Sequence, residues 1–372
     1  MAKERPNQSV ALMMATVQPV IVSVRRPIAI AQPIARPRGV WNAAEREERM
    51  DGSMPRASTM LSMARFLELL DSPRVQIVLI VASVLGAIIG LDTLVRHLTT
   101  DPLADVHAYY DAGARLNAGL PLYDQPAGTD DAAFYRYPPL LAIAFRPLAL
   151  LPFETAALIW EAFLIALFVL TIWRTGIRNR WTWIVLGWLA APFAWSLAIG
   201  QAQIAVTFLV ALGAPWAVAV AAHLKLLPTL VAVYWLGRRD WRALGMFVAW
   251  AVGLLVLSFV LEPAGTIAYL GFPDLSQVGA VENRSLYAFS PALWAVFAIV
   301  FAVAAWRFAP SRIGWHLAVG LSVLISPRLL MYQLCTLFAA VRPPDDPDVV
   351  AVSAPSPDSG HEHMPTDAVV QR

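Results

Sequence analysis

VQIVLIVASVLGAIIGLDTLV, residues 75–95, is an apolar run long enough to cross a lipid bilayer as a helix. About 20 consecutive apolar residues span the hydrocarbon core in this conformation. Further apolar runs follow along most of the chain, separated by short polar segments. This pattern predicts a membrane protein built from helices.

The composition supports lipid as the solvent of the fold. Hydrophobic residues make up 58% of the 372 residues, the mean hydropathy is +0.58, and only 15% of residues are charged. Soluble domains carry about 25% charged residues. The 14 tryptophans fit the aromatic belts at membrane interfaces. The net charge of +2 gives no indication of nucleic acid as a partner, and the single cysteine, Cys335, excludes an intrachain disulfide.

Hydropathy divides the chain into about ten transmembrane helical segments, so the predicted fold class is all-α, a polytopic membrane bundle. The segments run over residues 75–95, 156–173, 181–199, 203–214, two short helices hinged at 225–228, and then 243–261, 291–308, 315–325 and a closing run to 341. Residues 61–341 form the predicted transmembrane domain. Residues 1–60 read as a disordered basic region, which a misplaced start codon would also produce, and residues 342–372 read as a disordered cytoplasmic tail.

Charged side chains orient these segments. Lys and Arg beside membrane spans favour the cytoplasm, and arginines gather at one set of helix ends: Arg174, Arg178, Arg180, Arg238, Arg239, Arg242, Arg307 and Arg312. The helix ends on the opposite side adjoin residues 96–137, which include six Asp and three Arg, and the loop that carries Asp274 and Glu282. We therefore expect a multi-pass protein of the inner (plasma) membrane, with both termini in the cytoplasm and the polar loops outside.

The most polar part of this outer face is ADVHAYYDAGARLNAGLPLYD, residues 104–124. Its first part, residues 104–118, has helical spacing, and Gly119 followed by Pro121 is a typical helix end. We expect a short amphipathic helix that lies on the outer membrane face.

On this helix Asp105 and Tyr109 share one face, because residues four apart lie above each other. Two interpretations of the acids are open. Either they are only solvated, or Asp105 faces a pocket at headgroup level, where a carboxylate can accept a proton from a hydroxyl nucleophile.

Polar side chains also interrupt the apolar runs on the same face. An amide or ammonium group at membrane depth requires a partner. Lys225 either extends to the headgroups or binds the phosphate of an anionic lipid together with the other cations. The side chains in question are Gln203 after the break at Gly200, Lys225 before Pro228, Arg328 after Ser326-Pro327, and Asn283 and Arg284 in the facing loop.

Motifs for several other kinds of site are missing. The sequence holds no HExxH, no cysteine cluster, no P-loop and no GxGxxG, so we expect no metal site and no nucleotide cofactor. His361 and His363 have the character of incidental histidines in a solvated tail.

The order of these pieces resembles the integral-membrane glycosyltransferases of family 87, polyprenol-phosphate-mannose-dependent mannosyltransferases of GT-C architecture. The most specific motif is the segment 104–124 with its YPP and LALLP continuation. In place of the usual GQxN of the family, this chain has GQAQ, with Gln203 in the Asn position, and its transmembrane region is short. The matching motifs cover about residues 75–341: ADVHAYYDAGARLNAGLPLYD, FYRYPPLLAIAFRPLALLP, GQAQ, LKLLP, WLGRRDWRAL, ENRSL and LISPRLLMYQL.

The resemblance implies a transfer reaction outside the cytoplasm. The donor is a polyprenyl-phosphate-sugar, most often of mannose, and the acceptor is a hydroxyl of a lipid or glycan, with inversion at the anomeric carbon. No metal or nucleotide is required, although some GT-C enzymes use a divalent ion. By its position in the motif, Asp105 corresponds to the catalytic base.

The remaining polar residues are candidates for substrate binding. We expect the donor phosphate to meet Lys225, Arg328 and Arg284, and the sugar to be held by His107, Tyr109 and Tyr110. Gln203 and Asn283 complete the predicted set.

Two other functions stay open. A transporter or flippase of a lipid-linked sugar would use the same cations without needing Asp105 as a base. A non-catalytic membrane subunit would keep only the fold. The compact acidic helix and the lack of an evident internal repeat favour the enzyme.

Overall fold

The computed structural model describes residues 72–125, 134–271 and 283–344. All of them belong to one compact unit, Glu68–Arg372, and the other unit of the chain, Met1–Leu67, lies outside the described residues. The predicted disordered region 1–60 and all but the first three residues of the predicted tail 342–372, together with Asp274 and Glu282, also lie outside this part of the chain.

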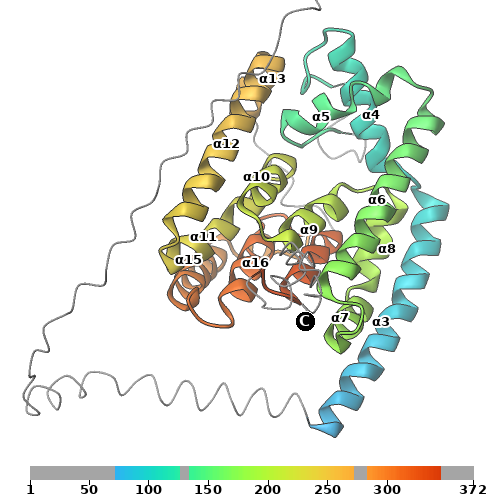
Figure 1. Cartoon of the computed structure of the whole chain (residues 1–372). Helices are drawn as coiled ribbons and strands as arrows, with labels where there is room; N and C mark the ends of the chain where they lie inside the picture. The colour runs from blue at the N-terminus through green and yellow to red at the C-terminus, as the bar shows by residue number, and fades with distance from the viewer. Residues whose placement is uncertain (1–71, 126–133, 272–282, 345–372) are drawn as a thin grey trace, which may run out of the picture. The chain divides into compact units, whose positions relative to one another are not determined.

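Every regular element among the described residues is a helix, and no strand occurs in this part of the chain, which confirms the all-α class (Figure 1). The label η marks 3₁₀ helices. In chain order the elements are α3 (Pro73–Thr100), α4 (Ala104–Asn117), α5 (Pro139–Phe145), η1 (Leu148–Leu150), α6 (Phe153–Thr175), α7 (Arg180–Trp188), α8 (Ala190–Ala198), α9 (Gln203–Leu212), α10 (Pro215–Leu224), η2 (Leu227–Ala232), α11 (Val233–Arg238), α12 (Trp241–Leu261), α13 (Pro263–Leu270), α14 (Leu286–Phe289), α15 (Pro291–Phe308), α16 (Gly314–Leu324) and η4 (Met331–Ala340).

Four single helices, α3, α6, α12 and α15, are long and apolar enough to cross a membrane. The expected span 181–199 is instead a pair, α7 and α8, bent by 64°. Pro192 explains the bend, because proline has no N–H to donate to the carbonyl of Trp188 and its ring clashes with that turn. As one broken span, the pair brings the number of spans among the described residues to five. The other expected segments form shorter helices.

Helix α3 packs against this bent pair through small residues (Figure 1). Gly86 and Gly90 have the GxxxG spacing that lets helix backbones approach closely. A Cβ on Gly90 would lie 2.6 Å from the Cβ of Ala190, and one on Gly86 would collide with the carbonyl of Gly187. Close backbone contact therefore holds α3 in place.

The short helices form the interior of the unit. Helix α9 contacts α10 and η4, and η4 also contacts α16; side chains on these helices, such as Val206, Val218 and Trp315, are buried. The expected hinge at residues 225–228 is confirmed, because α10 ends at Leu224 and η2 begins at Leu227.

Helix α4 has the predicted bounds but a different environment. Gly119 adopts a left-handed φ of 69°, and the N–H of Leu120 donates to the carbonyl of Arg115 at 2.9 Å, as in a Schellman cap. The helix buries Val106, Tyr109 and four more residues against α5 and α6. About half of its circumference is therefore core, and its position at the outer membrane face stays a prediction.

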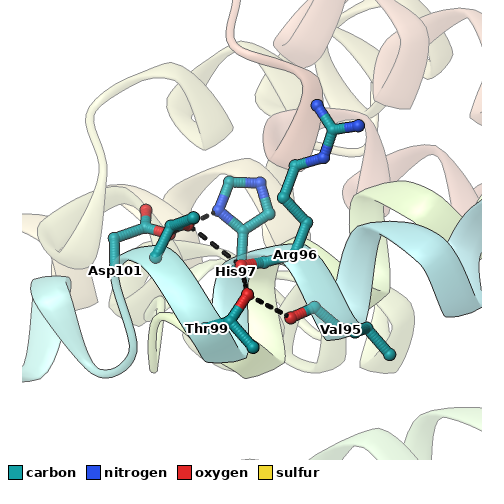
Figure 2. Close-up of polar contacts among 6 residues, drawn as sticks. Val95, Arg96, His97, Thr99 and Asp101 are labelled. Carbon is teal, nitrogen blue, oxygen red and sulfur yellow. Dashed lines mark hydrogen bonds and ion pairs between the residues drawn. The ribbon is translucent and has the colours of Figure 1, made fainter.

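Polar side chains form hydrogen bonds at the C-terminal end of α3, just before α4 (Figure 2). His97 Nδ1 lies 2.8 Å from Asp101 Oδ1, and the Thr99 hydroxyl donates to the Val95 carbonyl at 2.9 Å. The His97 ring also stacks on Trp195 of α8, with ring centroids 4.6 Å apart. The threonine hydroxyl bonds a carbonyl in the last turns of the helix, and the His97 ring holds this end against α8.

Candidate active site

The site begins where two helix ends meet. The N–H groups of Leu103 and Asp105, at the start of α4, donate to the carbonyls of Ala198 and Ile199, at the end of α8, at 3.0 and 3.1 Å. Both sets of groups lack partners within their own helices. Leu103 takes a left-handed φ of 59°, which is uncommon for a residue with a side chain. This junction sets the position of Asp105.

Gly200 turns the chain next to this junction. Its φ is 69°, and the Trp160 indole N–H donates to its carbonyl at 2.8 Å. A Cβ here would collide with the side chain of Val106 and lie 2.6 Å from Glu161 Oε1. Only glycine fits this position, and the turn it makes points Gln201 toward α4.

The Asp105 carboxylate takes part in a compact hydrogen-bond network. Its Oδ2 accepts from Gln201 Nε2 at 3.0 Å, and its Oδ1 accepts from the Tyr137 hydroxyl at 3.1 Å. The Tyr109 hydroxyl donates to Gln201 Oε1 at 2.8 Å. Gln201 and Tyr109 are fully buried, whereas Asp105 and Tyr137 are partly exposed. Of the acids of α4, Asp111 is exposed and fits the solvated interpretation, but Asp105 does not.

Burial shifts the acidity of this carboxyl group. Loss of hydration raises the pKa of Asp105 from 3.8 to about 6. The charge of Lys225, the hydrogen bond from Tyr137 and the charge of Arg136 oppose this rise, in that order. A general base works best with a pKa near the pH at which it acts, and Asp105 is ionised at neutral pH.

Lys225 lies close to the same network, at the end of α10. Its ammonium group donates to Gln203 Oε1 at 2.7 Å, and it lies over the rings of Tyr332 and Tyr137, 4.7 and 5.2 Å from their centroids. Gln203 in turn donates from Nε2 to the Thr336 hydroxyl at 2.6 Å. Protein groups thus fix a cation beside the carboxylate.

Arg328 follows the interruption of the apolar sequence at Ser326 and Pro327. Asn283 Nδ2 donates to the Pro327 carbonyl at 3.1 Å, and Asn283 Oδ1 accepts from the Leu329 N–H at 2.9 Å. The Arg328 Nε is buried without a hydrogen-bond partner, and its charge acts on the phenol of Tyr332. Asn283 therefore shapes the loop that presents Arg328, whereas Arg284 is exposed and contributes its backbone N–H.

Two predicted binding residues lie on another face of α4. The His107 ring stacks on Phe153 of α6 with centroids 3.7 Å apart, and the Tyr110 hydroxyl donates to the Leu151 carbonyl at 2.7 Å. The structure brings Asp105, Tyr109, Gln203 and Lys225 together but does not bring His107 and Tyr110 to them.

Sequence reasoning missed three residues of the site. Gln201, Tyr137 and Tyr332 complete the surroundings of Asp105 and Lys225. Each lies inside a motif that the sequence analysis singled out, GQAQ, YRYPP or SPRLLMYQL. Their position in those motifs was the available signal. Within the described ranges, no group of three or more His, Cys, Asp or Glu side chains could hold a metal ion.

Comparison with known proteins shows to which family the chain belongs. The model of glycosyltransferase family 87 matches residues 134–327, just over half of its length. The chain belongs to glycosyltransferase family 87. This match includes Tyr137, Gln201, Gln203 and Lys225, and it begins after Asp105.

Two curated relatives of this family 87 protein share the same name, polyprenol-phosphate-mannose-dependent alpha-(1-2)-phosphatidylinositol pentamannoside mannosyltransferase. The protein of Mycolicibacterium smegmatis is 27% identical over 205 residues, which cover 49% of this chain and 50% of the relative. That of Mycobacterium tuberculosis is 29% identical over 271 residues, 60% of this chain and 62% of the relative. The chain thus spans about half to three fifths of these relatives, and no solved structure matches it.

Proposed function

We propose that this family 87 protein is a membrane glycosyltransferase. It transfers a hexose, mannose in the first instance, from a polyprenyl-phosphate-sugar to a hydroxyl of a glycolipid or glycan on the extracytoplasmic face. The names of the two relatives support the donor and the kind of acceptor. The observation that carries the proposal is the partly exposed Asp105 carboxylate, which is held on one side by Gln201 and Tyr137.

In the proposed reaction Asp105 accepts the proton of the acceptor hydroxyl. The acceptor oxygen forms a bond to the anomeric carbon as the bond from that carbon to the phosphate oxygen breaks. Polyprenyl phosphate leaves with the bonding electron pair. Lys225 and Arg328 stabilise the charge that develops on this phosphate, an electrostatic effect that is often the largest contribution to catalysis. Because Lys225 is held by Gln203 and two rings, little reorganisation is needed during the reaction.

The first test is transfer from synthetic polyprenyl-phosphate-mannose in membranes that contain the wild type or Asp105→Asn. We expect the variant to lose about 10²- to 10⁴-fold in rate, the usual contribution of a general base, at equal protein level. Mass spectrometry of the lipids reports the product.

Asp111→Asn is the matched control, since it makes the same change on the exposed face of the same helix. It should retain the wild-type rate. Equal rates for wild type and Asp105→Asn would remove Asp105 from the mechanism. Movement of intact donor between leaflets without any glycosylated product would favour the transporter instead.

A further inference from the structure

Gln201 has an unusual place in the site. Its side chain is fully buried, and its amide contacts three of the polar groups around it: Asp105, Tyr109 and Tyr137. The partners of a buried amide define which way its oxygen and nitrogen point, because the oxygen only accepts and the nitrogen only donates hydrogen bonds. This orientation determines which atom of Gln201 faces the Asp105 carboxylate.

The backbone of Ala202 sets this direction. Its N–H donates to the Tyr109 hydroxyl oxygen at 3.2 Å, and a backbone N–H can act only as a donor. The hydroxyl hydrogen of Tyr109 is therefore free to point onward, and Gln201 Oε1 lies 2.8 Å away to accept it. With its oxygen held by Tyr109, the amide presents Nε2 to Asp105.

The two hydrogens of Nε2 are then both used. One goes to Asp105 Oδ2 at 3.0 Å and the other to the Tyr137 hydroxyl at 2.9 Å. The hydrogen of the Tyr137 hydroxyl has two acceptors within reach, Asp105 Oδ1 at 3.1 Å and Gln201 Oε1 at 3.2 Å. We assign it to Asp105, because an ionised carboxylate is the stronger acceptor and Oε1 already accepts from Tyr109. Each carboxylate oxygen thus accepts a bond from inside the protein, while the Asp105 side chain remains partly exposed.

We propose that Gln201 is the positioning residue of this site, which orients the Asp105 carboxylate so that its free lone pairs face the acceptor hydroxyl. The catalytic part of this assignment rests on the proposed function. A proton that arrives on Asp105 must occupy one of the outward lone pairs, because donors fill the inner ones. Gln201 itself touches no substrate and acts through Asp105.

The orientation can be measured without any sugar transfer. Infrared difference spectra of the purified full-length protein in lipid nanodiscs, recorded across a pH series, report the protonated carboxyl group of Asp105, which the Asp105→Asn variant identifies. Gln201→Met removes the donor to Oδ2, and loss of a hydrogen bond to the ionised form raises a pKa. We expect the titration midpoint to rise by about one pH unit or more.

Gln333→Met is the control, because Gln333 has a buried amide oxygen with no hydrogen-bond partner. Its midpoint should equal that of the wild type. If Gln201→Met does not accumulate in membranes, Gln201→Glu replaces it. The new carboxyl keeps the shape of the side chain and places a second acid beside Asp105, which should raise the midpoint further. A midpoint that stays at the wild-type value in the Gln201 variant overturns the proposal.

Transfer kinetics separate this proposal from the proposed function. With transfer present, Gln201→Met should lower kcat about 100-fold, the loss that a small misplacement of reacting groups produces. Its KM for the donor should stay within about twofold of the wild type, since the Lys225 contacts are untouched. If the wild type transfers no sugar from any lipid-linked donor, the proposed function fails, while the infrared midpoint still decides the role of Gln201 toward Asp105.

Discussion

A single carboxylate, Asp105, is subject to opposing influences in this site. Burial favours its neutral form, whereas Lys225, Tyr137 and Arg136 favour its charged form, and the pKa settles at about 6. A protein that only had to fold would avoid this cost with an apolar residue. The arrangement is useful if the group must be ionised at neutral pH and must also hold a proton for part of each reaction cycle.

The rate of transfer should therefore fall as the pH is lowered through about 6. Because the folded-state pKa lies above the unfolded value of 3.8, protonation of Asp105 makes the folded state more stable as the pH falls, and this gain is complete below 3.8. Activity and the stability contributed by this group thus change in opposite directions.

The measurement is a pH–rate profile with the folded fraction recorded at each pH. Loss of rate at pH 5 with full retention of folded protein fits Asp105 as the base. A rate independent of pH between 5 and 8 contradicts it.

Gly200 and Gly119 form a natural pair for a test of strain. Both have a φ of 69°, but a Cβ on Gly119 would meet nothing within 4 Å, whereas one on Gly200 collides with Val106. Gly119→Ala should cost about 1–2 kcal/mol for the left-handed conformation alone. Gly200→Ala should add about 1–3 kcal/mol for overpacking and should also displace Gln201.

Thermal unfolding in detergent, followed by size-exclusion chromatography of the folded fraction, ranks the two variants. We expect Gly200→Ala to unfold at the lower temperature and to lose transfer activity, and Gly119→Ala to keep activity. Equal loss of stability would mean that the backbone next to Val106 relaxes around the new methyl group.

The helices themselves show what a sequence can and cannot predict. Helix α15 has the expected bounds, since Ser290 caps it by accepting from the Leu293 N–H and Pro291 begins it. The closing segment is a 3₁₀ helix, η4, which hydropathy cannot distinguish from an α-helix. The burial of one face of α4 against the bundle was not predicted, because the polar residues of this helix outweigh the small ones that it buries. Asp105, Lys225 and Gln203 followed from motifs, whereas the bond between Asp105 and Gln201 joins residues 96 positions apart and has no local signal.

The close packing of α3 on the bent pair leads to a prediction about the packing of a whole helix. Gly86→Leu should push α3 away from Gly187 and lower the unfolding temperature of the protein, because the carbonyl of Gly187 occupies the space that a side chain would need. Gly253→Leu, in the exposed face of α12, meets nothing within 4 Å and should be tolerated.

Limited proteolysis and thermal unfolding of the two purified variants make the comparison. Similar stability for both would show that α3 can move outward without cost, and the contact through Gly86 would then not hold the helix.

The molecule as a whole has two chemically distinct ends. Exposed tryptophans such as Trp173, Trp183, Trp241 and Trp306 lie at the helix ends that carry the arginines. Tryptophan marks the depth of an interface, and arginine marks the cytoplasmic side. Alternation of the first three spans, α3, α6 and the bent pair, places the start of α4 and the end of α8 at the opposite end. The site lies there, and Lys225 over the Tyr137 ring brings the end of α10 to it.

Cysteine labelling tests this orientation. Starting from Cys335→Ala, single thiols are introduced at two exposed positions, by Leu120→Cys after the end of α4 and by Arg178→Cys between α6 and α7. A membrane-impermeant maleimide should label the first in intact cells and the second only after the membrane is opened. The reverse pattern would put the site in the cytoplasm and exclude an extracytoplasmic acceptor.

The contact between the start of α4 and the end of α8 also sets an order of synthesis. When the ribosome has made α4, the carbonyl groups that will accept its first N–H groups, and the amide that will hold Asp105, are still unmade. Two more membrane spans, α6 and the bent pair, must be inserted before that helix has its partners. Until then the Asp105 carboxyl group lacks the amide that will hold it. The growing chain therefore completes the surroundings of Asp105 only after the turn at Gly200 has been synthesised.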